Sequence, residues 1–78
     1  MKILVVDDDA GLRRTASLIL ENEGYDIATA SDGEEALARA ADWLPDLILT
    51  DVRMPGVDGL EFLDRYKEAG GTGRTIVM

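Results

Sequence analysis

The side chains best suited to chemistry in this 78-residue sequence are aspartates that directly follow apolar runs. Asp7, Asp8 and Asp9 come after a run at residues 2–6, and Asp51 comes after a second run at residues 46–50. The chain has no histidine and no cysteine, which excludes a Ser-His-Asp triad, a Cys-His pair and an ordinary zinc site. Carboxylates, together with any cation that they bind, are therefore the groups left to carry a reaction.

These aspartates are expected to meet if the two runs are neighbouring parallel strands. Strands lie about 4.8 Å apart in a sheet, and open parallel sheets bind ligands at the carboxyl ends of their strands. Carboxylates gathered at this range repel one another unless a cation neutralises them. Oxygen ligands alone favour Mg²⁺, so we predict a magnesium site at this edge. An alternative stays open for Asp9, which could simply cap the following helix.

Four segments have the composition of strands, namely residues 2–6, 25–30, 46–50 and 75–78. The first and third are nearly continuous apolar runs, which is typical of strands buried on both faces of a parallel sheet. Helical patterns separate all four segments. The order βαβαβαβ predicts one α/β domain with helices on both faces of the sheet.

Three helices are expected between these strands. The first covers residues 11–23, the second begins with a capping box at residues 31–34, and the third begins with another at residues 58–61. Arg13 and Arg14 are predicted to point outward. The side chains predicted to face the core are Leu12, Ala16, Ile19 and Leu20 on the first helix, Ala36, Leu37, Ala40, Ala41 and Leu44 on the second, and Leu60, Leu63 and Tyr66 on the third.

Three segments of the chain, residues 3–9, 32–37 and 47–59, together form a specific pattern. With this pattern the sequence resembles the receiver domain of two-component response regulators along its whole length. Residues 3–9 are similar to the first strand of that family with its acidic pair, and residues 47–59 are similar to its phosphorylation-site segment. Residues 32–37 match the usual start of its second helix. The resemblance implies a flavodoxin-like doubly wound parallel sheet of full strand order 2-1-3-4-5. The last strand and the last two helices would be missing here, so we expect the chain to be truncated at its C-terminus.

The resemblance also implies roles for single residues. Asp51 would accept a phosphoryl group from a sensor histidine kinase and become a 4-aspartylphosphate. Asp8 and Asp51 would bind Mg²⁺ directly, Asp7 would act mainly through bound water, and Arg53 would offer its backbone carbonyl. Gly59 would allow close packing at the start of the third helix. The parent protein would carry an output domain, commonly one that regulates transcription.

This sequence departs from the family pattern at two places. A complete receiver has a hydroxyl residue at the end of its fourth strand and a lysine at the end of its fifth, and neither is present. Lys2, Lys67, Thr50 and Thr75 stand at unsuitable positions. We therefore expect the 78-residue chain to be impaired in phosphorylation and switching. We also expect its uncovered apolar surface to promote self-association or the swapping of elements.

Two other functions are alternatives for this sequence. A pseudo-receiver would serve only as an interaction or dimerisation module, without phosphorylation. A haloacid-dehalogenase-type phosphatase would use Asp7 as its nucleophile, because Asp7 and Asp9 satisfy an Asp-x-Asp spacing. That class of enzyme expects Thr or Val where this chain has Gly11, and it leaves the segment around Asp51 unexplained.

Composition narrows the partners and the location. The formal net charge of −8 predicts no direct contact of this segment with nucleic acid, whose phosphates select cationic surfaces. No apolar run approaches the roughly 20 residues of a membrane span. We expect a cytoplasmic phosphoacceptor that is consumed in the reaction, rather than a turnover enzyme.

Overall fold

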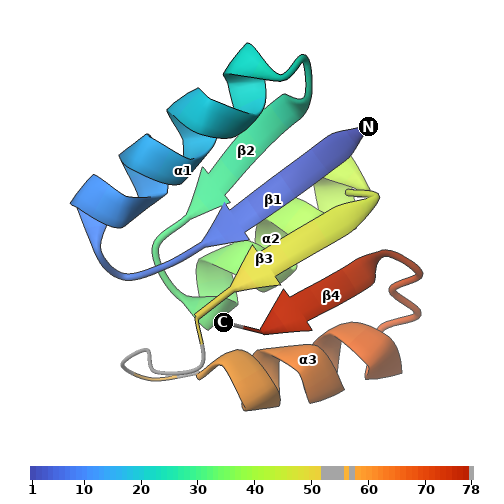
Figure 1. The fold of residues 1–78 in the computed structure, drawn as a ribbon. Coiled ribbons are helices and arrows are strands. Elements are labelled where there is room, and N and C mark those ends of the chain that lie inside the picture. Colours follow the sequence, from blue (N-terminus) through green and yellow to red (C-terminus); the bar gives the residue numbers. More distant parts are fainter. Residues whose placement is uncertain (52–55, 57, 78) are drawn as a thin grey trace.

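The structure is a computed structural model that describes residues 1–51, residue 56 and residues 58–77. Strands and helices alternate along the chain, as the sequence predicts (Figure 1). Their order is β1 (Lys2–Val6), α1 (Ala10–Asn22), β2 (Asp26–Ala30), α2 (Gly33–Trp43), β3 (Leu47–Thr50), α3 (Gly59–Glu68) and β4 (Arg74–Val77).

The strands form one parallel sheet in the order β2-β1-β3-β4. Val6, the last residue of β1, pairs with Ala30 on one side and with Thr50 on the other. The carboxyl ends of β1, β2 and β3 are therefore level with one another, and their arrowheads lie along one edge of the sheet (Figure 1). The flavodoxin-like arrangement expected from the sequence is confirmed for these four strands.

The hydrophobic core lies between one face of the sheet and the helices α2 and α3. Alternate strand residues point to the same face, so Leu4, Val6 and Ile48 meet these helices while Ile3 and Val5 point to the face on which α1 packs against β1 and β2. The buried cluster consists of Leu4, Val6, Ala30, Ala36, Ala40, Ile48, Phe62 and Tyr66. Burial on both faces explains the apolar run at residues 2–6.

The face that helix α3 turns to the core differs from the expected one at Leu60, while Tyr66 is buried as predicted. Leu60 was predicted to point inward and is 58% exposed, whereas Phe62 is fully buried. The helix begins at Gly59, and its buried residues are Gly59, Phe62 and Tyr66, at helical spacing. The Phe62 and Tyr66 rings stack with their centroids 5.8 Å apart. Two aromatic rings at this spacing decide which side of the helix meets the sheet.

Helices α1 and α2 also differ from the predicted pattern at single positions. Leu12 and Ile19 of α1 are exposed, and Ser17 is buried instead. Beyond the end of α2, Leu44 adopts the left-handed conformation with φ 54° and is 72% exposed. Trp43 packs partly against the core in its place. Leu44 ends the helix in a conformation that turns the chain away from the helix axis. Its side chain therefore does not continue the inward face of α2, although it is hydrophobic.

The capping of α2 is shifted by one residue from the predicted box. Asp32, rather than Ser31, is the N-cap, and its Oδ1 accepts a hydrogen bond of 2.8 Å from Glu35 N. Glu35 reaches back and accepts a bond of 2.8 Å from the Ser31 hydroxyl. Glu35 also accepts hydrogen bonds from the Ser31 N–H and from Arg39. The Ser31 hydroxyl, the Ser31 N–H and Arg39 together lower the pKa of Glu35. The reciprocal contacts fix where α2 begins.

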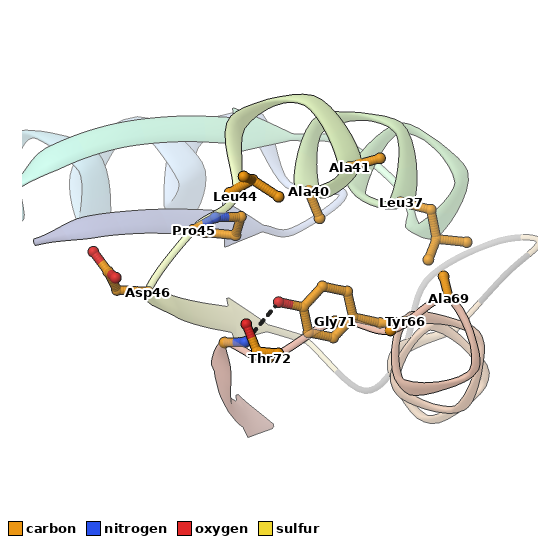
Figure 2. A pocket seen from close by; sticks show the side chains of 12 residues that line it. Leu37, Ala40, Ala41, Leu44, Pro45, Asp46, Tyr66, Ala69, Gly71 and Thr72 are labelled. Atoms are coloured by element: carbon orange, nitrogen blue, oxygen red, sulfur yellow. Dashed lines mark hydrogen bonds between the residues drawn. The ribbon is translucent and has the colours of Figure 1, made fainter.

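The amino ends of the strands are closed by a turn that packs on Tyr66. Gly73 N donates a hydrogen bond of 2.8 Å to the Tyr66 hydroxyl, Ala40 of α2 points toward the same side chain, and Leu37 points toward Ala69 (Figure 2). A Cβ atom at Gly71 would lie 2.4 Å from the Tyr66 ring, so this close approach requires glycine. The hollow of about 350 Å³ beside it is bordered by α2, Pro45 and residues 69–73. The hollow lies at the amino end of the sheet, whereas Asp7, Asp8 and Asp51 lie at the carboxyl end.

Candidate functional site

Three aspartates gather at the carboxyl edge of the sheet. Asp7 and Asp8 follow β1, and Asp51 follows the neighbouring strand β3, with Asp51 N donating a bond of 3.0 Å to Val6 O. Each of the three carboxylates offers an oxygen within 4.8 Å of those of the other two. The sequence predicted that these residues would meet because they end adjacent strands, and the structure brings them together.

The three carboxylates lie in different surroundings. Asp7 is only 5% exposed, Asp51 is half-buried and Asp8 is exposed. Asp7 Oδ1 accepts a hydrogen bond of 3.0 Å from Asp9 N. A buried carboxylate beside two others needs donors or a cation to offset the loss of hydration. Positive charge at this cluster would add to the compensation that the Asp9 N–H gives Asp7.

The donor set fits Mg²⁺. Mg²⁺ takes oxygen ligands at about 2.1 Å in octahedral geometry, so bound oxygens stand roughly 3 to 4.2 Å from one another. The limit of 4.8 Å on the carboxylate oxygens is wider by a margin that small side-chain rotations can close. Mg²⁺ also keeps several waters and needs only one or two direct carboxylates.

Asp9 has a different role, which settles the alternative left open by the sequence. Its Oδ1 accepts hydrogen bonds from Gly11 N at 2.9 Å and from Leu12 N at 3.2 Å. Asp9 is thus the N-cap of α1, with extended backbone and a side chain turned to the helix. Among the described residues, the acidic cluster consists of Asp7, Asp8 and Asp51.

Arg13 is a residue of this region that sequence reasoning missed. It was predicted to point outward, but its Nη1 donates a hydrogen bond of 2.7 Å to Asp7 O. Arg13 is half-buried and shares a helix face with Ser17, the buried residue of α1 one turn on. The spacing of Arg13 from Ser17 and Leu20 was the sequence signal that could have placed it on the inward face of α1. Its charge alone suggested the opposite.

Lys2 and Lys67 lie away from the site, and the Thr50 hydroxyl is turned to the backbone. Thr50 is fully buried, and its Oγ1 donates to the backbone oxygen of Asp51 at 3.1 Å. Lys2 begins β1 at the opposite end of the sheet, where its Nζ donates to Trp43 O at 3.2 Å. Lys67 lies on α3. The described site is therefore formed by carboxylates on the tips of β1 and β3.

Arg53, whose backbone carbonyl was expected to contribute, lies outside the described residues. Gly59 is buried at the first position of α3. This position agrees with the close packing expected there.

Fold and site together define a class of protein, a flavodoxin-like α/β domain with a carboxylate cluster between β1 and β3. The chain connects β1 to β2 on one side and β3 to β4 on the other, so this cluster lies at the point where the winding direction reverses. A family model described as the response regulator receiver domain matches residues 3–78. The chain belongs to this family, the receiver domains of two-component response regulators.

Known relatives agree with this assignment. The chain is 48% identical over 67 residues to the alkaline phosphatase synthesis transcriptional regulatory protein PhoP of Bacillus subtilis, covering 86% of this chain and 28% of PhoP. It is 40% identical over 77 residues to sporulation initiation phosphotransferase F of the same organism, covering 99% of this chain and 62% of that protein. The structure of the chemotaxis protein CheY4 of Vibrio cholerae matches with a TM-score of 0.93 and 36% identity, over 97% of this chain and 65% of CheY4.

The chain thus spans between about a quarter and two thirds of the length of these relatives. Neither the pseudo-receiver nor the phosphatase alternative is favoured by these likenesses. In the described part of the chain, every helix is too short or too polar to cross a bilayer.

Proposed function

We propose that Asp51 is the phosphoacceptor of this receiver domain and that Asp8 and Asp51 bind Mg²⁺ directly, with Asp7 acting mainly through bound water. The observation that carries the proposal is the convergence of the three carboxylates within 4.8 Å at the tips of β1 and β3. Bound Mg²⁺ would supply charge neutralisation and orientation for phosphoryl transfer. Arg53 would add its backbone carbonyl.

The surroundings of the three aspartates support this division of roles. Asp7 is buried and one of its oxygens already accepts a bond from Asp9 N, so a phosphoryl donor has poor access to it. Asp51 is half-buried at the end of a central strand. In the reaction, an Asp51 oxygen forms a bond to phosphorus as the bond between phosphorus and the donor breaks, which yields an acyl phosphate on the chain itself.

The proposed donor is the phosphohistidine of a sensor histidine kinase, and the proposed place is the cytoplasm. The chain would pass the signal to an output domain of the parent protein rather than turn over a substrate. With a net charge of −8, this segment would not itself bind nucleic acid.

Incubation with acetyl phosphate and Mg²⁺, followed by intact mass measurement, tests the proposal. Only Lys2 and Lys67 occur in the sequence, and neither can take the place of the lysine that completes the family's site. We therefore expect a small phosphorylated fraction that maps to Asp51 and requires Mg²⁺.

The Asp51→Asn variant is the control and should gain no phosphoryl group. Equal labelling of Asp51→Asn and wild type would contradict the assignment of the phosphoacceptor. Near-complete phosphorylation of the wild-type chain would instead contradict the expected impairment.

A further inference from the structure

The turn between β1 and α1 is held by hydrogen bonds on both sides of Asp8. Asp7 N donates to Ala30 O at 3.2 Å, which continues the sheet by one residue. Asp9 caps α1, and Arg13 N donates to Asp9 O at 3.0 Å as the helix begins. Between these two anchors lies the peptide unit that joins Asp7 to Asp8, whose carbonyl is Asp7 O.

Arg13 holds that peptide unit. Its Nη1 lies 2.7 Å from Asp7 O, a short bond with a charged donor. The Asp8 side chain is exposed, and no side-chain hydrogen bond of Asp8 is observed within the described residues. The orientation of the Asp7–Asp8 peptide therefore decides where the Asp8 carboxylate points. Without the Arg13 bond, this peptide unit keeps only the hydrogen bond from Asp9 N to Asp7 Oδ1 between its two anchors. It can then tilt and carry Asp8 away from Asp51.

We propose that Arg13 is a positioning residue of the Mg²⁺ site, because its hydrogen bond to Asp7 O keeps the Asp8 carboxylate within reach of Asp51. This inference rests on the function proposed above. Arg13 acts on the metal through the backbone and not as a ligand. Arg13 is half-buried on α1, and a guanidinium in such a position needs a hydrogen-bond acceptor. Asp7 O is that acceptor.

The positive charge of Arg13 makes an electrostatic role and a positioning role predict opposite changes in Mg²⁺ affinity. A cation near the site repels Mg²⁺, so a purely electrostatic role predicts tighter binding when Arg13 is replaced by a neutral residue. A positioning role predicts weaker binding, because the lost backbone contact loosens a ligand. Partners that orient metal ligands typically change affinity by about 10-fold or more.

Arg14 supplies the matched control. It has the same charge, lies next to Arg13 on α1 and is exposed, and no side-chain hydrogen bond or ion pair of Arg14 is observed within the described residues. Arg13→Ala and Arg14→Ala therefore remove the same charge, but only the first removes the bond to Asp7 O.

Titration of the 78-residue chain with MgCl₂, followed by the amide signals in two-dimensional NMR, measures the affinity and reports the folded state in the same spectra. We expect the Kd of Arg13→Ala to rise about 10-fold and that of Arg14→Ala to stay within about 2-fold of wild type or to fall slightly, as screened charges do. Arg13→Lys, which keeps a charged donor, should restore part of the affinity.

Equal Kd values for Arg13→Ala and Arg14→Ala, or tighter binding by Arg13→Ala, would overturn the inference while leaving the proposed function intact. A Kd for Arg13→Lys no better than that for Arg13→Ala would also overturn it. If Arg13→Ala is unfolded in its metal-free spectrum, Arg13→Met, which keeps most of the side-chain length but removes the donors, replaces it in the comparison with Arg14→Ala, and Kd values within 2-fold of each other would then overturn the inference. Absence of Mg²⁺ binding by the wild-type chain would overturn the proposed function and this inference together.

Discussion

Adjacent aspartates of one short turn carry different roles in this receiver domain. Asp8 belongs to the acidic cluster, whereas the next residue, Asp9, uses its carboxylate to cap α1. Both are exposed and carry the same charge. The difference between them lies in the direction of the side chain, which the geometry of the turn sets.

Substitution of these neighbours separates metal binding from helix capping. Asp8→Asn should weaken Mg²⁺ binding by about 10-fold or more, because affinity for hard cations follows the charge of the ligands. Asp9→Asn should leave the Kd nearly unchanged, since asparagine is as good an N-cap as aspartate. Isothermal titration calorimetry with MgCl₂ measures both values. Equal losses of affinity in the two variants would show that only the local charge matters.

At the scale of elements, side-chain caps define where helices begin. Asp9, Asp32 and Asp58 precede the three helices, and each accepts a hydrogen bond from a backbone N–H of the first turn. Short helices gain much of their definition from such contacts, because each cap satisfies an otherwise unpaired donor.

Loss of the Asp32 cap should destabilise α2. Asp32→Ala removes the acceptor of the Glu35 N–H and should lower the free energy of unfolding by about 1 kcal/mol. Asp42→Ala, at an exposed position near the end of the same helix, removes the same charge without removing a cap. Urea unfolding followed by circular dichroism compares the two variants, and a smaller loss for Asp32→Ala than for Asp42→Ala would contradict this role.

The start of α2 should also respond to acid. Hydrogen bonds from the Ser31 hydroxyl and backbone, followed by Arg39, hold the pKa of Glu35 below its ordinary value of 4.5. A carboxylate with a lowered pKa stabilises the folded state above its unfolded pKa, and this contribution is lost as the pH falls through the folded value. The stability difference between wild type and Glu35→Gln should therefore shrink below pH 4.5.

Ser31→Ala supplies the complementary measurement. It removes the main cause of the shift, so the pKa of Glu35 should rise toward its ordinary value. NMR titration of the Glu35 side-chain carboxyl gives this pKa directly. An unchanged value in Ser31→Ala would show that the hydroxyl bond of 2.8 Å has no part in the shift.

At the scale of the whole molecule, the described sheet leaves apolar surface uncovered. The edge strand β4 exposes half of Ile76, and α1 packs against β1 and β2 but leaves Leu12, Leu18 and Ile19 exposed on its outer side. An open strand edge with apolar side chains pairs readily with another chain.

We therefore expect the 78-residue chain to self-associate or to swap elements at raised concentration. Ile76→Lys places a charge on the open edge and should shift the mass toward the monomer. Leu44→Lys is the control, because Leu44 is even more exposed, at 72%, but follows α2 away from the edge. Light scattering over a concentration series measures the mass. A wild-type chain that stays monomeric throughout, with cooperative unfolding, would contradict this expectation.

Local sequence patterns were sufficient to predict most of the strands and helices of this molecule and the place of its acidic cluster. The apolar runs ending at Val6 and Thr50 predict buried parallel strands, and helix-breaking residues such as Gly24 separate the elements. From the acids that follow the two runs, the meeting of Asp7 and Asp8 with Asp51 could be predicted as well. These inferences succeed because periodicity and the chemistry of strand ends depend on residues close together in the chain.

Packing between elements and the shape of the turn between β1 and α1 decided the remaining features. It turned Phe62 rather than Leu60 to the sheet, assigned Asp9 to the helix instead of the cluster, and directed Arg13 to the carbonyl of Asp7. Each of these choices depends on partners elsewhere in the fold, or on a turn whose shape is set by the elements on either side. A hydrophobic or charged residue can satisfy a local pattern in more than one orientation, and only the neighbours supplied by folding select between them.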